Sequence, residues 1–194
     1  MALTTAAKIR ATWLNIGDNT QDTRLGVLIA QAEAVMKSIC KQPLASESVA
    51  YEFSGDGLQT RILPYTVPVV LSSLQYKAAP TDATWTTATG AIVVKSEGVN
   101  QLYLENGMTR GYLWRMNATV GYDGTTFAIP KDLETTCEEI TVELFKSTDF
   151  SGRENRFGIA TLSTTEGGQV QTTKYVSLMD SFRGKLSPYI VRFW

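Results

Sequence analysis

The feature of the sequence that most constrains its fold is a long run of apolar residues with helical spacing near the N-terminus. Between residues 20 and 41 the apolar positions recur every three or four residues, at Leu25, Leu28, Ile29, Ala32, Val35, Met36, Ile39 and Cys40. This period predicts an amphipathic helix, which Pro43 ends. A helix with a single apolar stripe depends on packing against other helices.

Three other stretches show the same period. Apolar stripes occur within residues 4–14, 130–147 and 173–186. Their members are Ala6, Ile9, Trp13 and Leu14; Leu133, Cys137, Ile140 and Leu144; and Tyr175, Leu178, Met179, Phe182 and Leu186. We therefore expect a small helical bundle. Its core is predicted to contain Leu28, Ile29, Ile140 and Leu144.

A β-rich block, residues 48–122, separates the second and third of these helices. It consists of short alternating stretches with turn residues every eight to twelve positions, which is typical of strands. Gly55-Asp56-Gly57 lies between VAYEF and TRILP and predicts a hairpin. Pro64 and Pro68 predict that the following strand lies at an edge or begins there. The expected fold class is α+β, with a helical bundle and a β-rich insertion in a single domain spanning residues 1–194.

The C-terminal quarter contains two unusual segments. Residues 148–172 are polar and glycine-rich, and they are longer than an ordinary connection in a compact domain. They are interpreted as a functional loop or arm, or as a segment that is disordered when the protein is alone. The chain then ends in SPYIVRFW, residues 187–194. Chain ends are usually polar and frayed, so this apolar tail requires an explanation.

Composition argues against several kinds of chemistry. The 194 residues include no histidine, so Ser-His and Cys-His nucleophile pairs and imidazole metal ligands are absent. The two cysteines, Cys40 and Cys137, are interpreted as small buried hydrophobic residues. Ser54-Gly55-Asp56-Gly57 lacks the lysine and the following helix of a phosphate-binding loop. We therefore expect no catalytic residues, no metal site and no cofactor.

Charge and hydropathy bear on location. The net charge of −1 predicts no strong general attraction to nucleic acid or to an anionic membrane. The apolar stretches are too short to span a membrane. The N-terminus lacks the basic flank and apolar core of a secretion signal. We expect a protein made in the cytoplasm and without a membrane partner.

Two clusters of functional residue types have simpler interpretations. The acidic residues Glu134, Glu138, Glu139 and Glu143 are interpreted as a solvated helix face or as subunit contacts, rather than as paired catalytic carboxylates. Tyr112 and Trp114 share a strand face, and core packing explains them at least as well as a stacking platform.

Three stretches carry a resemblance to a known family. The first is IRATWLNI, residues 9–16, followed by DTRLGVLIAQAEAVMKSIC. The second is Val120-Gly121-Tyr122, which leads through AIPKDL, residues 128–133, into a helix. The third is LMDSFR, residues 178–183. In order and spacing these stretches, with Leu63-Pro64 and Pro68-Val69 between them, resemble the head-to-tail adaptor (connector) proteins of tailed bacteriophages. The Thr-rich residues 78–90 and the long arm depart from the family pattern.

The resemblance implies a structural protein of the virion. Such adaptors form a ring, typically of twelve subunits, under the portal at the head–tail junction. The ring extends the DNA channel, through which the genome passes without sequence recognition, and it is a platform for the stopper or tail. The resemblance implies that the C-terminal segment docks on the portal. The candidate residues are Arg183, Lys185, Tyr189, Ile190, Val191, Arg192, Phe193 and Trp194.

Physical arguments agree with a docking role for the tail. Aromatic residues and arginine concentrate binding energy at interfaces, and many tails on one ring gain avidity. The alternative is a tail that folds back on its own bundle. The arm is expected to contact a neighbouring subunit or the next ring. Its candidate residues are Arg153, Arg156, Phe157, Ile159 and Leu162.

Other functions remain open at this point. A stopper or tail-completion protein is the nearest alternative, although such proteins are usually mostly β. A receptor- or glycan-binding module would use Trp85, Tyr103, Tyr112 and Trp114. A histidine-free hydrolase would use Glu138 on the acidic helix.

Overall fold

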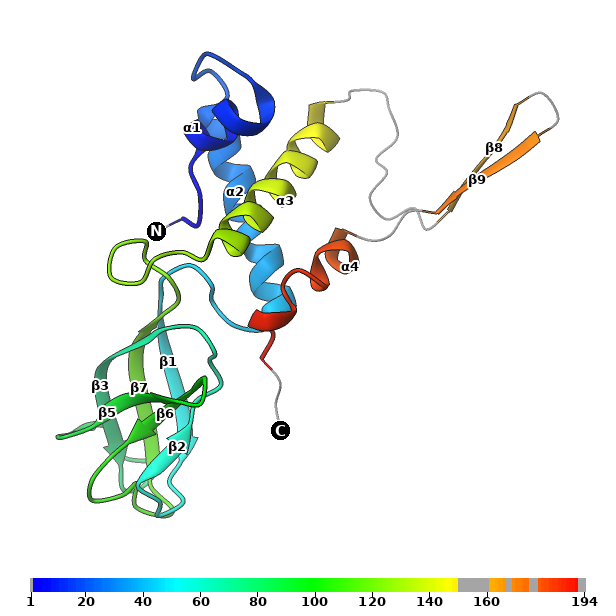
Figure 1. Ribbon diagram of the computed structural model, residues 1–194. Helices are drawn as coiled ribbons and strands as arrows, with labels where there is room; N and C mark the ends of the chain where they lie inside the picture. The colour runs from blue at the N-terminus through cyan, green and yellow to red at the C-terminus, as the bar shows by residue number, and fades with distance from the viewer. Residues whose placement is uncertain (1, 150–160, 167–168, 175–177, 192–194) are drawn as a thin grey trace. The chain divides into compact units, whose positions relative to one another are not determined.

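The computed structural model describes residues 2–149, 161–166, 169–174 and 178–191. The chain divides into two compact units. Residues 2–40 and 129–188 form the helical unit, and residues 41–128 and 189–194 form the β unit. The chain thus enters the β unit after Cys40, leaves it after Ala128 and returns to it at Tyr189. Figure 1 shows the strands of residues 41–128 grouped together within the β unit. The expected α+β class is confirmed.

The helical unit begins with α1 (Ala6–Ile9), which continues as a π-helical turn over Arg10–Leu14. Two long helices follow, α2 (Asp22–Cys40) and α3 (Lys131–Asp149), and they pack together. The apolar stripes meet in this unit, where Leu28, Ile29 and Ile140 are buried as predicted. Leu144 is only half-buried, because the buried stripe of α3 passes instead through Thr141 and Phe145. Cys40 and Cys137 are buried free thiols, which confirms their interpretation.

The region expected to be an arm contains a hairpin. Strands β8 (Thr161–Glu166) and β9 (Gln169–Lys174) pair antiparallel. The last helix, α4, therefore does not begin at residue 173 but spans Leu178–Arg183, and a 3-10 turn follows at Ser187–Tyr189. β-branched residues near the end of β9 favour a strand over a helix, and Gly184 follows the end of α4.

Two antiparallel sheets build the β unit. The first has the strand order β1-β7-β3-β4. Its strands are β1 (Glu47–Ser54), β7 (Leu113–Val120), β3 (Val69–Lys77) and β4 (Thr86–Ala88). The second has the order β2-β6-β5. Its strands are β2 (Thr60–Ile62), β6 (Val99–Tyr103) and β5 (Ile92–Ser96).

The hairpin predicted around Gly55-Asp56-Gly57 is wrong. β1 pairs with β7, and β2 pairs with β6 in the other sheet. The glycine turn carries the chain between the two sheets and rests on a distant loop: the Gly55 N–H donates to the Tyr112 carbonyl at 2.9 Å. A Cβ atom on Gly55 would lie 2.0 Å from the carbonyl oxygen of Thr109. Glycine is required here for close approach, not for a tight hairpin.

The strand after Pro68 begins at an edge of its sheet and becomes internal further along. β3 starts directly after Pro68 and pairs with β7 from Val69 to Lys77, but it pairs with β4 only from Leu74 to Tyr76. The prediction of a strand start at Pro68 is confirmed, whereas the last part of β3 is central. Trp114 on β7 is 3% exposed, and its ring centroid lies 5.1 Å from that of Tyr76. Tyr112 also stacks on Tyr76. The interpretation as core packing is confirmed for Trp114, whereas Tyr112 is half-buried and precedes the start of β7.

The Gly-Tyr pair that follows β7 has a clear physical basis. Gly121 adopts φ +107°, and a Cβ atom there would lie 2.5 Å from the carbonyl oxygen of Ala45. The Gly121 N–H donates to Pro68 O at 3.0 Å, and the Tyr122 N–H donates to Leu44 O at 2.8 Å. Three chain segments therefore meet at Gly121, and only glycine fits between them.

Candidate assembly surfaces

The start of the C-terminal tail is held by a buried glutamine in the β unit. Gln42 Nε2 donates to the carbonyl oxygen of Tyr189 at 2.6 Å and to Thr66 Oγ1 at 2.6 Å. The Thr66 N–H donates back to Gln42 Oε1 at 2.9 Å. Ile190 and Val191 are half-buried. The first residues of the tail are thus placed by side-chain hydrogen bonds to the loop that precedes β3.

Sequence analysis did not identify Gln42. Its only signal in the sequence is its position just before Pro43; in the structure it follows Lys41, which comes directly after α2 and adopts a left-handed φ of 61°. A residue in such a connection is usually exposed. Here the glutamine is buried because it satisfies backbone groups of two other segments.

The remaining predicted portal residues differ in their surroundings. Arg183, at the end of α4, is exposed. Lys185 is also exposed, but its ammonium group forms an ion pair with Glu139 on α3, and it lies 5.7 Å from the Phe182 ring centroid. Arg192, Phe193 and Trp194 lie outside the described residues.

The predicted arm residues fall into two groups. Arg153, Arg156, Phe157 and Ile159 lie outside the described residues. Leu162 lies within β8, where it pairs in register with Thr173 of β9. Leu162 is therefore the predicted arm residue whose backbone the structure describes, within the β8–β9 hairpin.

The acidic helix face is not simply solvated, which corrects the earlier interpretation of Glu138. This residue is 3% exposed. Its Oε1 accepts a hydrogen bond from Thr4 Oγ1 at 3.1 Å, and it lies 2.8 Å from Lys8 Nζ. Its Oε2 accepts a hydrogen bond from the Trp13 indole at 2.9 Å. A buried carboxylate must be paired, and here the N-terminal segment supplies every one of these partners.

Glu134 and Glu139 extend this contact face. Lys8 also pairs with Glu134, and this hydrogen bond lowers the pKa of the Glu134 carboxyl. Glu139 pairs with Lys185. The acidic residues of α3 therefore bind the first and last parts of the helical unit.

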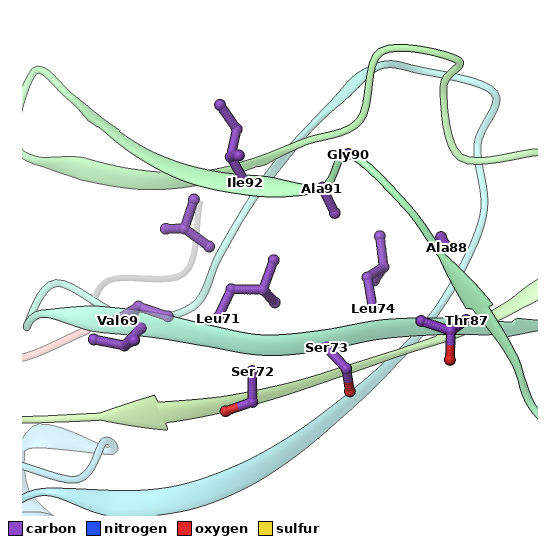
Figure 2. A pocket seen from close by; sticks show the side chains of 12 residues that line it. Val69, Leu71, Ser72, Ser73, Leu74, Thr87, Ala88, Gly90, Ala91 and Ile92 are labelled. Atoms are coloured by element: carbon purple, nitrogen blue, oxygen red, sulfur yellow. The ribbon is translucent and has the colours of Figure 1, made fainter.

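A groove in the β unit lies between the two sheets. Its volume is about 500 Å³. Figure 2 shows Val69, Leu71 and Leu74 of β3 along one side, and Ala91 and Ile92 across from them. Thr87 and Ala88 of β4 lie at one end. The walls are mainly aliphatic, and Ser72 and Ser73 are the hydroxyl-bearing residues of β3 among the lining residues.

Trp85, one of the aromatic residues considered for a glycan site, lies against two cations. Arg115 Cζ is 4.0 Å and Lys77 Nζ is 4.8 Å from its ring centroid. Arg115 also pairs with Glu52 at 2.5 Å. These cation–π contacts occupy the ring within the chain itself.

Two further observations concern the described part of the chain. None of its helices combines the length and hydropathy needed to cross a membrane. Within the same residues, no group of three or more Cys, Asp or Glu side chains is arranged to hold a metal ion.

Comparison with solved structures finds this fold in the necks of gene transfer agent (GTA) particles. A chain in the neck of an empty GTA particle, computed with C6 symmetry, gives a TM-score of 0.62 at 14% identity over 97% of this chain and 89% of that chain. A chain in the neck of a native GTA particle, computed with C12 symmetry, gives 0.58 at 13% identity over 97% and 88%. A chain in the virion of a native GTA particle gives 0.56 at 16% identity over 76% and 80%.

No known family model and no curated protein matches the sequence. At these identities the comparison establishes a shared fold. The chain therefore has the fold of proteins found in GTA necks, along nearly its whole length.

Proposed function

We propose that the protein is a structural component of a virion neck, at the head–tail junction. It assembles as a homo-oligomeric ring, docks under the portal, extends the DNA channel and supports the stopper or tail below. The observation that carries this proposal is the fold match to a GTA neck chain over 97% of the sequence. The order of motifs that resembles phage adaptor proteins supports it independently.

The C-terminal segment is the proposed portal anchor. Tyr189 is fixed to the β unit through Gln42, so the last residues of the tail start from a defined point. A fixed starting point lowers the entropy that an anchor loses on docking. Phe193 and Trp194 then supply the aromatic side chains that commonly dominate interface energy.

The ring itself requires contacts between copies. Residues 148–174 include the predicted arm, residues 148–172, and the β8–β9 hairpin, and we assign them to contacts with a neighbouring subunit or the next ring. A net charge of −1 suits a channel through which DNA slides without being held.

The alternatives fit the structure less well. Stopper and tail-completion proteins are usually mostly β, whereas this chain devotes a whole unit to packed helices. A glycan module would need exposed aromatic rings, but Trp114 is buried and Trp85 is covered by Arg115 and Lys77. Both oxygens of Glu138 are bound by donors from the N-terminal segment, which gives this carboxylate a structural role.

The test measures loading of the cognate portal ring by light scattering on a sizing column. The full chain is expected to add to the portal in a ring stoichiometry. A variant ending at Val191 keeps the Gln42–Tyr189 contact but removes Arg192, Phe193 and Trp194, and it is expected not to load. A variant ending at Leu186 removes the whole tail and is expected to behave in the same way.

Two results would change the proposal. If the full chain does not load the portal, the adaptor function is wrong. If the variant ending at Val191 loads as well as the full chain, the ring can stand, but the aromatic end of the tail is not its anchor.

A further inference from the structure

The β8–β9 hairpin is polar at nearly every position of its sequence. Its register pairs Leu162 with Thr173 and Val170 with Thr165, so no two apolar residues face each other across the strands. All other positions are Thr, Ser, Gln, Glu or Lys. An isolated hairpin is marginally stable in water even with an apolar face. This hairpin therefore needs a partner that supplies something other than apolar packing.

The hairpin can bind a partner through the backbone groups at the outer edges of β8 and β9. Each of its strands has a partner on one side only, among the residues that the structure describes. Natural proteins protect such edges with proline, bulges or centrally placed lysine. β8 has none of these residues, and in β9 the lysine stands at the very end. Within the described residues, both edges are therefore open to strand pairing.

The groove of the β unit borders open edges as well. β5 is the terminal strand of the sheet β2-β6-β5. β4 pairs with β3 only from Leu74 to Tyr76, so the earlier part of β3 has no strand on that side in the described chain. The unpaired part of β3 lies across the groove from residues 90–93. Ile92 and Val94 of β5 are 51% and 44% exposed.

We propose that the β8–β9 hairpin of one copy pairs with the free edge of β5 in a second copy, at the groove beside β3. The inference rests on the proposed ring and names the contact that links its subunits. Main-chain hydrogen bonds to an added strand supply affinity without an apolar hairpin face. The hairpin gains a third strand, and aliphatic groove walls beside β5 become covered.

A second copy is the occupant because each chain carries both halves of the contact. In the described residues, β8 and β9 pair only with each other. A contact between two different surfaces of the same chain is head-to-tail. Such contacts propagate from copy to copy and close into a ring when the rotation allows it.

Disulfide trapping between copies tests the proposal. One preparation carries Thr164→Cys on β8 or Thr172→Cys on β9, and another, with a different mass tag, carries Ile92→Cys or Val94→Cys on β5. They are mixed under a mild oxidant and analysed by mass. The matched control is Ile62→Cys, which is 69% exposed on β2, the opposite edge strand of the same sheet.

The native cysteines give little background in this assay. Burial raises the pKa of Cys40 to about 11 and that of Cys137 to about 12. Both thiols therefore stay protonated at neutral pH, and a protonated thiol is a poor nucleophile.

The expected result is a disulfide between differently tagged chains for at least one hairpin–β5 pair. Its yield should exceed that of the Ile62→Cys control by about tenfold, because paired strands hold opposite Cβ atoms within about 5.5 Å. Equal yields would overturn the proposal. A disulfide that forms only within one chain of an Ile92→Cys/Thr164→Cys double variant would also overturn it, because the hairpin would then fill its own groove.

A second pair of variants distinguishes strand pairing at the β5 edge from nonspecific association of the two chains. Lysine on an edge strand opposes strand addition. Adding Ile92→Lys to the Val94→Cys chain should reduce cross-linking to the control yield, and adding Ile62→Lys should leave it unchanged. If Ile92→Lys and Ile62→Lys reduced cross-linking equally, the contact would be through the face of the sheet, and edge pairing would be refuted. Portal loading is measured separately, so failure of this contact is distinguishable from failure of the adaptor function.

Discussion

The indole N–H of Trp13 donates a hydrogen bond to Glu138 Oε2 at 2.9 Å, although the two residues are 125 positions apart. Trp13 lies in the π-helical turn after α1, and Glu138 is buried on α3. Thr4 and Lys8 complete the coordination of the same carboxylate. The N-terminal segment is thus fastened to the helical unit by polar contacts around one buried charge.

Replacing this carboxylate should destabilise the helical unit. Glu138→Gln removes the charge that Lys8 pairs with and weakens the acceptors of Thr4 and Trp13. We expect a loss of about 1–3 kcal/mol in the free energy of unfolding, the usual cost of disrupting a buried polar partner. Urea unfolding followed by tryptophan fluorescence measures it. The control is Glu143→Gln, an exposed residue on the same helix, which should change stability by less than about 0.5 kcal/mol. Equal effects of the two variants would contradict a central role for Glu138.

A side chain at Gly121 should strain the junction after β7. The backbone there has φ +107°, and the new Cβ would approach Ala45 O to 2.5 Å. Gly121→Ala is expected to cost about 1–3 kcal/mol and to lower the midpoint of thermal unfolding. Gly26→Ala provides the contrast, because it lies inside α2 with open space around it. That variant should raise stability by about 0.5–1 kcal/mol. An unchanged midpoint for Gly121→Ala would show that the loop at Ala45 yields easily.

Gln42 should hold residues 189–191, the first part of the C-terminal tail that it contacts, in a fixed conformation. Gln42→Leu keeps a buried apolar volume but removes the donor to Tyr189 and the bonds to Thr66. Amide hydrogen exchange of residues 189–191 is expected to become faster, while exchange in α2 stays unchanged. Gln59→Leu is the control, because Gln59 is exposed and its amide donates to Glu105 O, away from the tail. If exchange at residues 189–191 does not respond to Gln42→Leu, the tail is held by other contacts.

The loop that leads into α3 should make stability sensitive to acid. Hydrogen bonds from the Phe127 and Thr125 backbone N–H groups lower the pKa of Asp123 to about 2 from 3.8. A lowered folded-state pKa contributes stability that is present above the unfolded pKa and is lost as the pH falls through the folded one. In the wild type this contribution should therefore disappear between about pH 4 and pH 2.

Asp123→Asn tests this pH dependence. Asparagine keeps a side-chain oxygen as acceptor but does not titrate in this range. The urea midpoint of the variant should fall less steeply than that of the wild type from pH 4 to pH 2. Parallel curves for the two proteins would mean that other carboxylates account for the acid sensitivity.

Several features of this fold were predictable because they depend on local patterns. The stripe in residues 20–41 identified α2 and its buried residues Leu28 and Ile29, and the seam of α3 identified Ile140. A period of 3.6 reports which face of a helix is apolar, whatever that face packs against. The same periodicity wrongly predicted that Leu144 is in the core. Counting in steps of exactly four residues from Ile140 leads to Leu144, whereas the buried face of α3 continues through Thr141 to Phe145.

Strand partners were not predictable in the same way. Gly55-Asp56-Gly57 has the composition of a hairpin turn, yet β1 and β2 belong to different sheets. A turn signal reports backbone freedom and does not say which strands meet beyond it. Likewise, Thr172 pairs with Ser163 and Thr173 with Leu162 in the β8–β9 hairpin. The sequence of the arm does not indicate this pairing.

Taken by itself, the sequence determined the α+β class, the apolar faces of the two long helices, the burial of both cysteines and the order of motifs that resembles phage adaptors. These depend on the period and spacing of neighbouring residues. Only the tertiary structure decided the roles of Glu138, Gln42 and Gly121. Each of these residues is defined by groups from distant parts of the chain, Trp13, Tyr189 and Ala45. Residue type alone cannot reveal a partner that lies close only after the chain has folded.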